Sequence, residues 1–549
     1  MKKTFHNPIL SGFYPDPSIC RVGDDYYMAT SSFAYFPGIP IFHSKDLVHW
    51  EQIGHAIHRP EQIDYSRAEH SEGLWAPTLR YHEGTFYMIN TFVSEGREAE
   101  RHNYIVTAKD PAGPWSDPIV VEGADGIDSS LFFDDDGSVW YCGNYINAEE
   151  LYKGHHGIYL CELDPVTFQF KGERKTIWPG EKSRSKWIEA PHIYKINGMY
   201  YLLVAEGGTF TNHSVMMARC DTIDGEYEIC PRNPIVTHRH ISLMNPISVT
   251  GHADFVETQN GEWWMVLLAV RPYGTTKPQF NTGRETFLIP VKWEEDGWLK
   301  VDNENGLVNE YERRPNLPEV FYPVPSRSDN FENSTLGMMW NQIRSMKTGF
   351  YSLTDRKGYL RLFLEPERLS DHYTTPAFLG RRQQHQYFAA GTAMEFTPKA
   401  ENEEAGMALI QNHDYYYLFT VCREEGKNIL KVSRRLNDSP VISHLMEGFE
   451  DEHTEYHVVT QELARVELPE QFSRIYLSVQ CQLETYDFYY GFQEGEKIPV
   501  LTGADASLLS TNVAGGFVGA YLGMYATANG EKSNDYADFD WFTYDPIEE

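Results

Sequence analysis

Residues 189–208 read EAPHIYKINGMYYLLVAEGG, a stretch with two short apolar runs on either side of an Asn-Gly turn. A polar residue begins the first run, and an aromatic pair opens the second. Asn-Gly between two runs of this kind is a strong signal for a tight β-hairpin, because both turn residues tolerate positive φ. The stretch therefore predicts two antiparallel strands that are adjacent in the chain.

The same pattern occurs four more times before residue 300, with successive starts 59, 53, 61 and 63 residues apart. The other copies are DPSICRVGDDYYMATSS from Asp16, WAPTLRYHEGTFYMINTF from Trp75, DSSLFFDDDGSVWYCGN from Asp128 and HADFVETQNGEWWMVLLAV from His252. Elements such as HSKDLVHW (43–50) follow the hairpins and supply a third and a fourth strand. No long amphipathic helix is indicated. Five four-stranded units that cannot bury their own faces predict a five-bladed β-propeller, expected over residues 1–312.

The five repeat starts are expected to meet at one mouth of the central channel, because the first strand of every blade lies innermost. These starts are Asp16, Trp75, Asp128, Glu189 and His252. Three of the five are carboxylates, and like charges gathered in a funnel raise the pKa of at least one member. A single Pro-Asp-Pro would be better explained by a turn whose Asp satisfies nearby amides. The repetition instead favours a functional site.

Two carboxyl groups that face each other across a sugar-sized gap are the machinery of glycoside hydrolysis. Asp16 lies in YPDPSIC (14–20), where the flanking prolines leave little backbone freedom and the second one favours extended geometry. This stiffened carboxylate suits the general base. Glu189 lies in the apolar sequence KWIEAPH, which favours its protonated form and suits the general acid. Asp128 is then expected to orient the acid and to keep its pKa high by like-charge repulsion.

Other residues suit a saccharide pocket. Trp75 can stack on a pyranose face, and Phe33 follows the second predicted strand of the first blade. Arg271 ends the second strand of the fifth blade, where it would hold sugar hydroxyls or remain a solvated charge. For His252 the pattern leaves three roles open: binding a hydroxyl, coordinating an ion on the channel axis, or filling the channel.

Four motifs resemble glycoside hydrolase family 43, in particular its two-domain β-xylosidases and α-L-arabinofuranosidases. They are NPILSGFYPDPSICRVGDDYYMATSSFAYFPGIPIFHSKDLVHW, GLWAPTLRYHEGTFYM, GIDSSLFFDDDGSVWY and WIEAPHIYKINGMYYLLVAEGG. The resemblance covers essentially the whole chain. It implies a five-bladed propeller and an inverting mechanism, with Asp16 as the base, Asp128 as the pKa modulator and Glu189 as the acid.

The repeat pattern stops in the Pro-rich stretch YERRPNLPEVFYPVPSRSDNF (311–331), which predicts a linker over residues 313–327. Alternating stretches such as RIYLSVQCQLETYDFYYGF beyond it predict a β-sandwich over residues 328–549. The predicted fold class is therefore all-β, and the resemblance implies that the sandwich is concanavalin-like.

The resemblance also implies that a loop of the sandwich reaches over the propeller mouth, and Phe517 in VAGGFVGAYLG is the candidate residue that narrows the pocket. No cofactor is expected to be required. The sandwich is a candidate for a structural calcium, with Asp329, Asp538 and Asp540 as conceivable ligands and solvated charges as the equal alternative.

The composition excludes some partners. A net charge of −32 repels polyanions, so nucleic acid and anionic membranes are not expected to bind. The start MKKTFHNPIL lacks the apolar region of a secretory signal, and no apolar run reaches 18 residues. Seven scattered cysteines without a C-x-x-C pair suggest free thiols in a reducing cytoplasm. Homo-oligomers remain compatible with the sequence.

The leading prediction is an exo-acting, inverting hydrolase that releases terminal β-D-xylose from xylo- or arabinoxylo-oligosaccharides and also accepts terminal α-L-arabinofuranosides. One alternative is an enzyme with predominant α-L-arabinofuranosidase activity. Another is a non-catalytic carbohydrate-binding propeller, which needs no set of convergent carboxylates. A phosphorylase on a similar propeller would need several cationic groups at the mouth, and the sequence places only Arg271 near a blade end.

Overall fold

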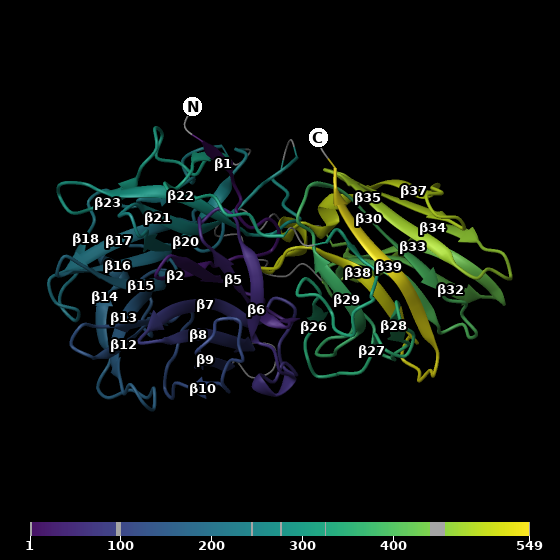
Figure 1. The fold of residues 1–549 in the computed structure, drawn as a ribbon, viewed down its shortest axis with the longest axis horizontal. Coiled ribbons are helices and arrows are strands. Elements are labelled where there is room, and N and C mark those ends of the chain that lie inside the picture. Colours follow the sequence, from purple (N-terminus) through teal and green to yellow (C-terminus); the bar gives the residue numbers. More distant parts are fainter. Residues whose placement is uncertain are drawn as a thin grey trace.

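A computed structural model describes residues 3–94, 100–242, 245–274, 277–323, 326–439 and 456–547. Figure 1 shows two bodies side by side, one formed by the N-terminal part of the chain and one by the green to yellow C-terminal part. Nearly all regular structure in the described ranges is β. The short helical segments there are η1 (Pro60–Gln62), η2 (Gly180–Lys182), η3 (Ala506–Leu509) and α1 (Thr511–Ala514).

The first body consists of five antiparallel sheets that follow one another along the chain, as the repeats predict. The first blade contains β2 (Ser18–Val22), β3 (Asp25–Ala29), β5 (Gly38–Ser44) and β6 (Glu51–Ile57). The second contains β7 (Gly73–His82), β8 (Thr85–Ser94), β9 (Glu100–Ala108) and β10 (Ile119–Val120). The third contains β11 (Ser130–Phe133), β12 (Val139–Ile146), β13 (His156–Leu163) and β14 (Lys175–Trp178). The fourth contains β15 (Glu189–Ile196), β16 (Met199–Glu206), β17 (Ser214–Cys220), β18 (Glu228–Ile229) and β19 (Val236–Thr237). The fifth contains β20 (Ser248–Glu257), β21 (Trp263–Val270), β22 (Glu285–Trp293) and β23 (Leu299–Val301).

The first strands of the blades form a closed ring. β2, β7, β11, β15 and β20 contact one another in this order, and β20 contacts β2 again. Outside the blades, β1 (Thr4–His6) pairs with β24 (Tyr311–Arg313), which joins the two ends of the propeller segment. The fold of this body is therefore a five-bladed β-propeller with its first strands around the axis.

The fourth blade illustrates how the repeat specifies its hairpin. Asn197 and Gly198 form the turn with φ values of 52° and 81°, a conformation that these residue types tolerate. β15 and β16 pair outward from this turn, and the register shifts by a bulge between Glu189 and His192. The first strands of the second and fifth blades also carry irregular registers near the same end. Bulges of this kind redirect side chains at the rim of a sheet.

The second body is a sandwich of two antiparallel sheets. One contains β25 (Ser328–Asp329), β27 (Tyr351–Ser352), β28 (Leu360–Phe363), β30 (Tyr387–Glu395), β35 (Ile475–Gln482), β36 (Thr485–Gly491), β37 (Ile498–Asp505) and β39 (Tyr536–Pro546). The other contains β29 (Ala377–Arg382), β31 (Glu404–Asn412), β32 (Tyr415–Glu424), β33 (Lys427–Asn437), β34 (Val458–Glu467) and β38 (Tyr521–Thr527). Apolar side chains from both sheets, such as Phe388 and Phe419, fill one continuous core between them.

The two bodies share an interface with main-chain and side-chain contacts. β4 (Tyr35–Phe36) of the propeller segment pairs with β26 (Gln342–Ile343) of the sandwich segment. The rings of Tyr35 and Tyr521 stack with their centroids 3.6 Å apart. Arg382 donates a hydrogen bond from Nε to the carbonyl of Phe13 at 2.7 Å. These contacts hold the sandwich against the mouth of the propeller where the functional site lies.

All seven cysteines lie in the described ranges, where they are buried and unpaired. No helix of the described part of the chain is long and apolar enough to cross a membrane.

Candidate active site

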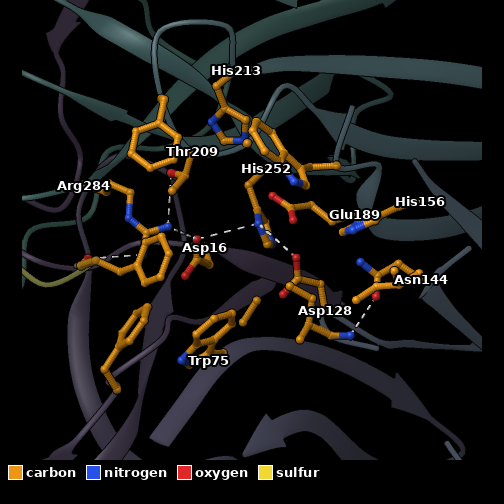
Figure 2. A pocket seen from close by; sticks show the side chains of 18 residues that line it. Asp16, Trp75, Asp128, Asn144, His156, Glu189, Thr209, His213, His252 and Arg284 are labelled. Atoms are coloured by element: carbon orange, nitrogen blue, oxygen red, sulfur yellow. Dashed lines mark hydrogen bonds and ion pairs between the residues drawn. The ribbon is translucent and has the colours of Figure 1, made fainter. Parts of the chain in front are cut away.

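A cavity of about 340 Å³ opens at the mouth of the propeller axis, and both bodies contribute to its wall (Figure 2). Its lining includes the predicted residues Asp16, Phe33, Trp75, Asp128, Glu189, His252 and Phe517. The sequence did not single out the other lining residues, which are Ala76, Ile127, Asn144, Ile146, His156, Trp187, Gly208, Thr209, Phe210, His213 and Arg284. The structure thus brings the three carboxylates together with most of the proposed sugar-binding side chains.

Three of the repeat starts adopt the same rare backbone conformation. Asp16, Asp128 and His252 have φ values of 56°, 56° and 49°, in the left-handed region. Aspartate and histidine are among the few residue types other than glycine that enter this region with modest strain. The expectation of extended geometry at Asp16 is therefore wrong. The hydrogen bonds described next hold the side chain in place and outweigh the preference imposed by the following proline.

Asp16 is buried and held in its ionised form by its partners. The hydroxyl of Ser31 donates to Oδ2 at 2.5 Å, and Nη1 of Arg284 donates to Oδ1 at 2.9 Å. Nδ1 of His252 lies 3.6 Å from Oδ1. Burial raises the pKa of Asp16, but Arg284, His252 and Ser31 together lower it below its ordinary value. A buried carboxylate that stays deprotonated is the state that a general base needs.

The pKa values of Glu189 and Asp128 are shifted in the opposite direction, upward. Burial and the negative charge of Asp16 raise the pKa of Glu189 to about 7, although Arg284 opposes this shift. Burial and the charges of Glu189 and Asp16 also raise the pKa of Asp128 well above its usual range. Nδ1 of His252 lies 4.0 Å from Oδ2 of Asp128. These two neighbouring carboxyl groups therefore retain a proton near neutral pH, when Asp16 has already lost its own.

Asn144 connects the segments that carry these two carboxyl groups. Its Oδ1 accepts a hydrogen bond from the backbone N–H of Ile127 at 2.8 Å, and its Nδ2 donates to the carbonyl of Ile188 at 3.4 Å. Ile127 and Ile188 precede Asp128 and Glu189 directly. One amide side chain thus fixes the spacing between the third and fourth blades at the site.

An aromatic wall closes one side of the cavity. Phe33 and Phe517 stack with ring centroids 6.3 Å apart, and Trp75 meets Phe517 edge-on at 5.4 Å. The backbone N–H of Phe517 donates to the hydroxyl of Ser71 at 3.0 Å. A Cβ atom at the preceding Gly516, where φ is +71°, would lie 2.2 Å from that hydroxyl. Glycine therefore lets the sandwich loop approach the propeller closely enough to place Phe517 in the wall.

Arg271 lies outside the cavity, contrary to its expected position among the sugar-binding residues. Its guanidinium pairs with buried Glu285 through contacts of 2.7 Å and 2.8 Å, and it donates to the carbonyl of Gln384 at 3.2 Å. It therefore connects the fifth blade to the sandwich. The cavity arginine is Arg284, which precedes β22 at the same end of the blade. In an antiparallel blade the second strand ends, and the third strand begins, at the mouth where the first strand starts. The segment between β21 and β22, which contains Arg284, therefore lies at this mouth, and this topology could have identified Arg284 from the sequence.

A buried polar network closes the channel one layer beneath the site. Asp254 on β20 accepts hydrogen bonds at 2.8 Å from Ser18 and from Nη1 of Arg80, and another from the hydroxyl of Tyr194. Nη2 of Arg80 lies 2.9 Å from Nδ1 of His192. Burial raises the pKa of Asp254, but Arg80, His192 and Tyr194 lower it to about 2. This network, formed by four of the five blades, fills the channel beneath the cavity lining and was not anticipated from the sequence.

The three aspartates considered as calcium ligands have other partners. Asp538 binds Arg361, and Asp540 binds Arg474. Asp329 accepts a hydrogen bond from the indole N–H of Trp340. Within the described ranges, none of the three belongs to a cluster of ligating groups close enough to share an ion. Each of the three aspartates thus pairs with another side chain of the sandwich.

A five-bladed propeller with one ionised and two proton-retaining carboxyl groups in an axial pocket defines a glycoside hydrolase. The sequence model described as "Glycosyl hydrolases family 43" matches residues 5–299, and that of the "Beta xylosidase C-terminal Concanavalin A-like domain" matches residues 328–545. The chain belongs to glycosyl hydrolase family 43, and its second body is the concanavalin-like sandwich.

Relatives of known name align over the whole chain. A xylosidase/arabinosidase of Butyrivibrio fibrisolvens is 42% identical, with 99% of each chain covered. A non-reducing end alpha-L-arabinofuranosidase of Bacteroides ovatus is 38% identical and covers 99% of this chain and 95% of its own length. The crystal structure of a xylan beta-1,4-xylosidase from Bacillus halodurans matches with a TM-score of 0.89 at 35% identity and covers 98% of this chain and 100% of its own.

Proposed function

We propose that this enzyme is an exo-acting, inverting glycoside hydrolase that releases terminal β-D-xylose from xylo-oligosaccharides and also hydrolyses terminal α-L-arabinofuranosides. The named activities of the relatives support the two sugar types. The observation that carries the mechanism is the opposite protonation preference of two carboxyl groups in one pocket. Asp16 is held ionised, whereas Glu189 keeps a proton up to about pH 7.

The proposed reaction is a single displacement. Asp16 accepts a proton from a water molecule while the water oxygen attacks the anomeric carbon, and Glu189 donates its proton to the departing glycosidic oxygen. The bond between the anomeric carbon and that oxygen breaks as the new bond to the water oxygen forms. Attack from the face opposite the leaving group inverts the anomeric configuration. Asp128 keeps its own proton near neutral pH and then carries no charge, so in this proposal it acts beside Glu189 by position and does not raise the pKa of Glu189.

The cavity supports exo action because it is closed on two sides. The network around Asp254 fills the channel beneath the lining residues, and the ring of Phe517 belongs to its side wall. A cavity of about 340 Å³ is near the lower end of the size range of ligand pockets and suits one terminal pentose better than a continuous chain. Sugar units can then leave only from a chain end.

The relative from Bacteroides ovatus favours one alternative, in which α-L-arabinofuranosides are the better substrates. A non-catalytic carbohydrate-binding propeller has less support, because the chain belongs to an enzyme family and gathers three carboxylates. A phosphorylase has less support as well. Arg284 is the one arginine or lysine among the described cavity residues, and Asp16 already neutralises it.

The test is a comparison of kcat/KM on 4-nitrophenyl β-D-xyloside and 4-nitrophenyl α-L-arabinofuranoside, with proton NMR of a 4-nitrophenyl β-D-xyloside digest. We expect turnover of both aryl glycosides, higher kcat/KM on the xyloside, and α-xylose as the first product. A higher value on the arabinofuranoside would select the alternative activity. Early β-xylose would refute inversion and would make Asp16 a nucleophile.

A further inference from the structure

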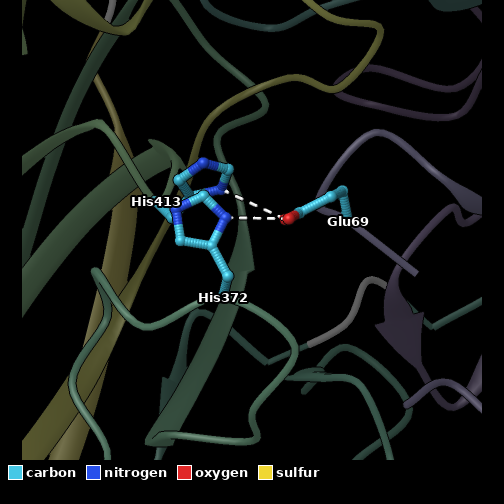
Figure 3. Close-up of side chains that lie close together, drawn as sticks. All are labelled: Glu69, His372 and His413. Carbon is cyan, nitrogen blue, oxygen red and sulfur yellow. Dashed lines mark hydrogen bonds and ion pairs between the residues drawn. The ribbon is translucent and has the colours of Figure 1, made fainter. Parts of the chain in front are cut away.

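A second cluster of titratable side chains lies at the interface between the two bodies, outside the cavity. Glu69 belongs to the propeller, in the connection between β6 and β7. His372 belongs to the connection between β28 and β29, and His413 to the turn between β31 and β32, so both come from the sandwich. Figure 3 shows the two imidazole rings next to each other with the Glu69 carboxylate facing them.

The three side chains direct ligand atoms toward one point. Nδ1 of His372 lies 2.8 Å from Oε1 of Glu69, and Nδ1 of His413 lies 3.6 Å from Oε2. One nitrogen or oxygen from each residue lies within 4.8 Å of the other two. The buried atoms Oε2 of Glu69 and Nδ1 of His413 make no hydrogen bond to any described residue. A cation between them would satisfy both.

Neighbouring groups orient the ligands. Oδ2 of Asp414 lies 3.3 Å from Nε2 of His413, so the other ring nitrogen of this histidine faces Glu69. A carboxylate behind the second nitrogen of an imidazole is the arrangement that fixes the ring and raises its basicity in metal sites.

Arg344 fixes the two loops that present the other ligands. Its Nε donates to the carbonyl of Ala68 at 2.6 Å, and its Nη1 donates to the carbonyl of Thr374 at 2.9 Å. These carbonyls lie one residue before Glu69 and two residues after His372. Nη2 lies 3.5 Å from Oε2 of Glu69, too long for a strong hydrogen bond. The guanidinium therefore organises the site and leaves the carboxylate available to an ion.

We propose that Glu69, His372 and His413 bind a divalent transition-metal ion that crosslinks the propeller and the sandwich. Two imidazole nitrogens and one carboxylate oxygen are a ligand set suited to Zn²⁺ and to Co²⁺ or Ni²⁺. Calcium and magnesium prefer oxygen ligands throughout and do not fit this set. The imidazole centroids are 3.8 Å apart, a distance at which two protonated rings repel but two neutral rings can share an ion.

The ion would act on the segment that shapes the catalytic pocket. Two residues after Glu69, Ser71 accepts the hydrogen bond from the backbone N–H of Phe517 at 3.0 Å. The carbonyl of Ser71 also accepts the indole N–H of Trp75 at 3.1 Å. An ion that fixes Glu69 to the sandwich therefore restrains both aromatic residues at one wall of the cavity.

The test uses the full-length protein after chelator treatment and dialysis, with ZnCl₂ and CoCl₂ as probes. We expect calorimetry to show one Zn²⁺ per chain that is absent from the double variant His372→Ala/His413→Ala, together with a Zn²⁺-dependent rise in the Tm of the wild type. Co²⁺ should give the visible absorption bands of a site with nitrogen ligands. Glu69→Gln should weaken binding at least about tenfold, because a lost ligand matters no less than a lost supporting contact.

The matched control is His457→Ala, which removes a surface histidine whose Nδ1 lies 2.7 Å from Oδ1 of Asp438 in the sandwich. This variant should bind Zn²⁺ as the wild type does. Equal Zn²⁺ stoichiometry in the wild type and the double variant would overturn the proposal, and so would the same loss in the control. Because His372 is 48% exposed, the single variant His372→Gln keeps the test valid if the double variant fails to fold.

Discussion

Replacing Arg284 with glutamine should move both limbs of the pH profile of kcat/KM to higher pH. Arg284 lowers the pKa of Asp16 and also opposes the upward shift of the pKa of Glu189. Activity falls on the acid side when Asp16 gains a proton and on the basic side when Glu189 loses one. Without the guanidinium, Asp16 takes up its proton at higher pH and Glu189 keeps its proton to higher pH. Glutamine retains a hydrogen-bond donor but is shorter and removes the charge.

The contact distance sets the size of the effect. At the 2.9 Å that separates Nη1 of Arg284 from Oδ1 of Asp16, an effective dielectric constant of about 20 gives an attraction on the order of 6 kcal/mol. The remaining contacts with Ser31 and His252, together with the new amide donor, offset part of this loss. An acid limb displaced by about 1–3 pH units, or about 1.4–4 kcal/mol, is therefore expected. The basic limb should move less, because Arg284 does not contact Glu189 directly.

The assay is hydrolysis of 4-nitrophenyl β-D-xyloside across a pH series, with protein stability checked at each pH by circular dichroism. Arg271→Gln is the matched control, because Arg271 also pairs with a buried carboxylate at the same end of the fifth blade but does not line the cavity. The control should lose stability and keep both limbs in place. An acid limb that stays unmoved in Arg284→Gln, or that moves equally in the control, would refute the role given to Arg284.

Three further predictions follow from the same geometry. Glu189→Gln should lose most activity on xylobiose and keep a much larger fraction on dinitrophenyl β-xyloside, because the dinitrophenolate leaving group needs little help from an acid. Asp16→Asn should lose activity on both substrates alike. A loss confined to xylobiose in Asp16→Asn would mean that the acid and the base are exchanged. Asp128→Asn, which keeps a residue type that tolerates the left-handed backbone, should leave the basic limb near its wild-type pH, because Asp128 is uncharged while it keeps its own proton; a limb that moves to lower pH would mean that Asp128 is ionised while Glu189 keeps its proton. Phe517→Ala should raise KM for xylobiose by about 10-fold or more, given about 1.5–3 kcal/mol for a buried aromatic contact, whereas Phe321→Ala at the exposed surface should not; unchanged KM in Phe517→Ala would remove that ring from the sugar wall.

Repetition made most of the propeller predictable. The hairpin pattern around Asn197 and Gly198 is present in five copies, and each copy specifies its own strands through local turn chemistry and alternation. The first strand of each blade then brings Asp16, Asp128 and Glu189 together without further information. Such signals can be recognised in one sequence because each turn and strand depends on residues that are adjacent in the chain.

Features that depend on contacts between distant segments could not be predicted in the same way. The left-handed backbone at Asp16 arises from partners 15 and 268 residues away, which override the local effect of proline. The choice of Arg284 over Arg271 depends on which arginine meets Glu285, a residue that the pattern does not distinguish. The polar network around Asp254 joins residues from four blades, so its contacts form only when those blades pack together.

Because Phe517 belongs to the sandwich, substrate preference and catalytic chemistry can change through mutations in different domains. The residues that transfer protons all belong to the propeller, whereas Phe517 in the aromatic wall of the cavity belongs to a loop of the sandwich. The carbonyl of Phe517 accepts a hydrogen bond from Nη2 of Arg284 at 3.3 Å, so loop mutations that keep this carbonyl in place can reshape substrate preference while Arg284 stays beside Asp16. For an engineer, libraries confined to the residues around Phe517 offer a way to change selectivity between pentoses while the hydrolytic machinery stays intact.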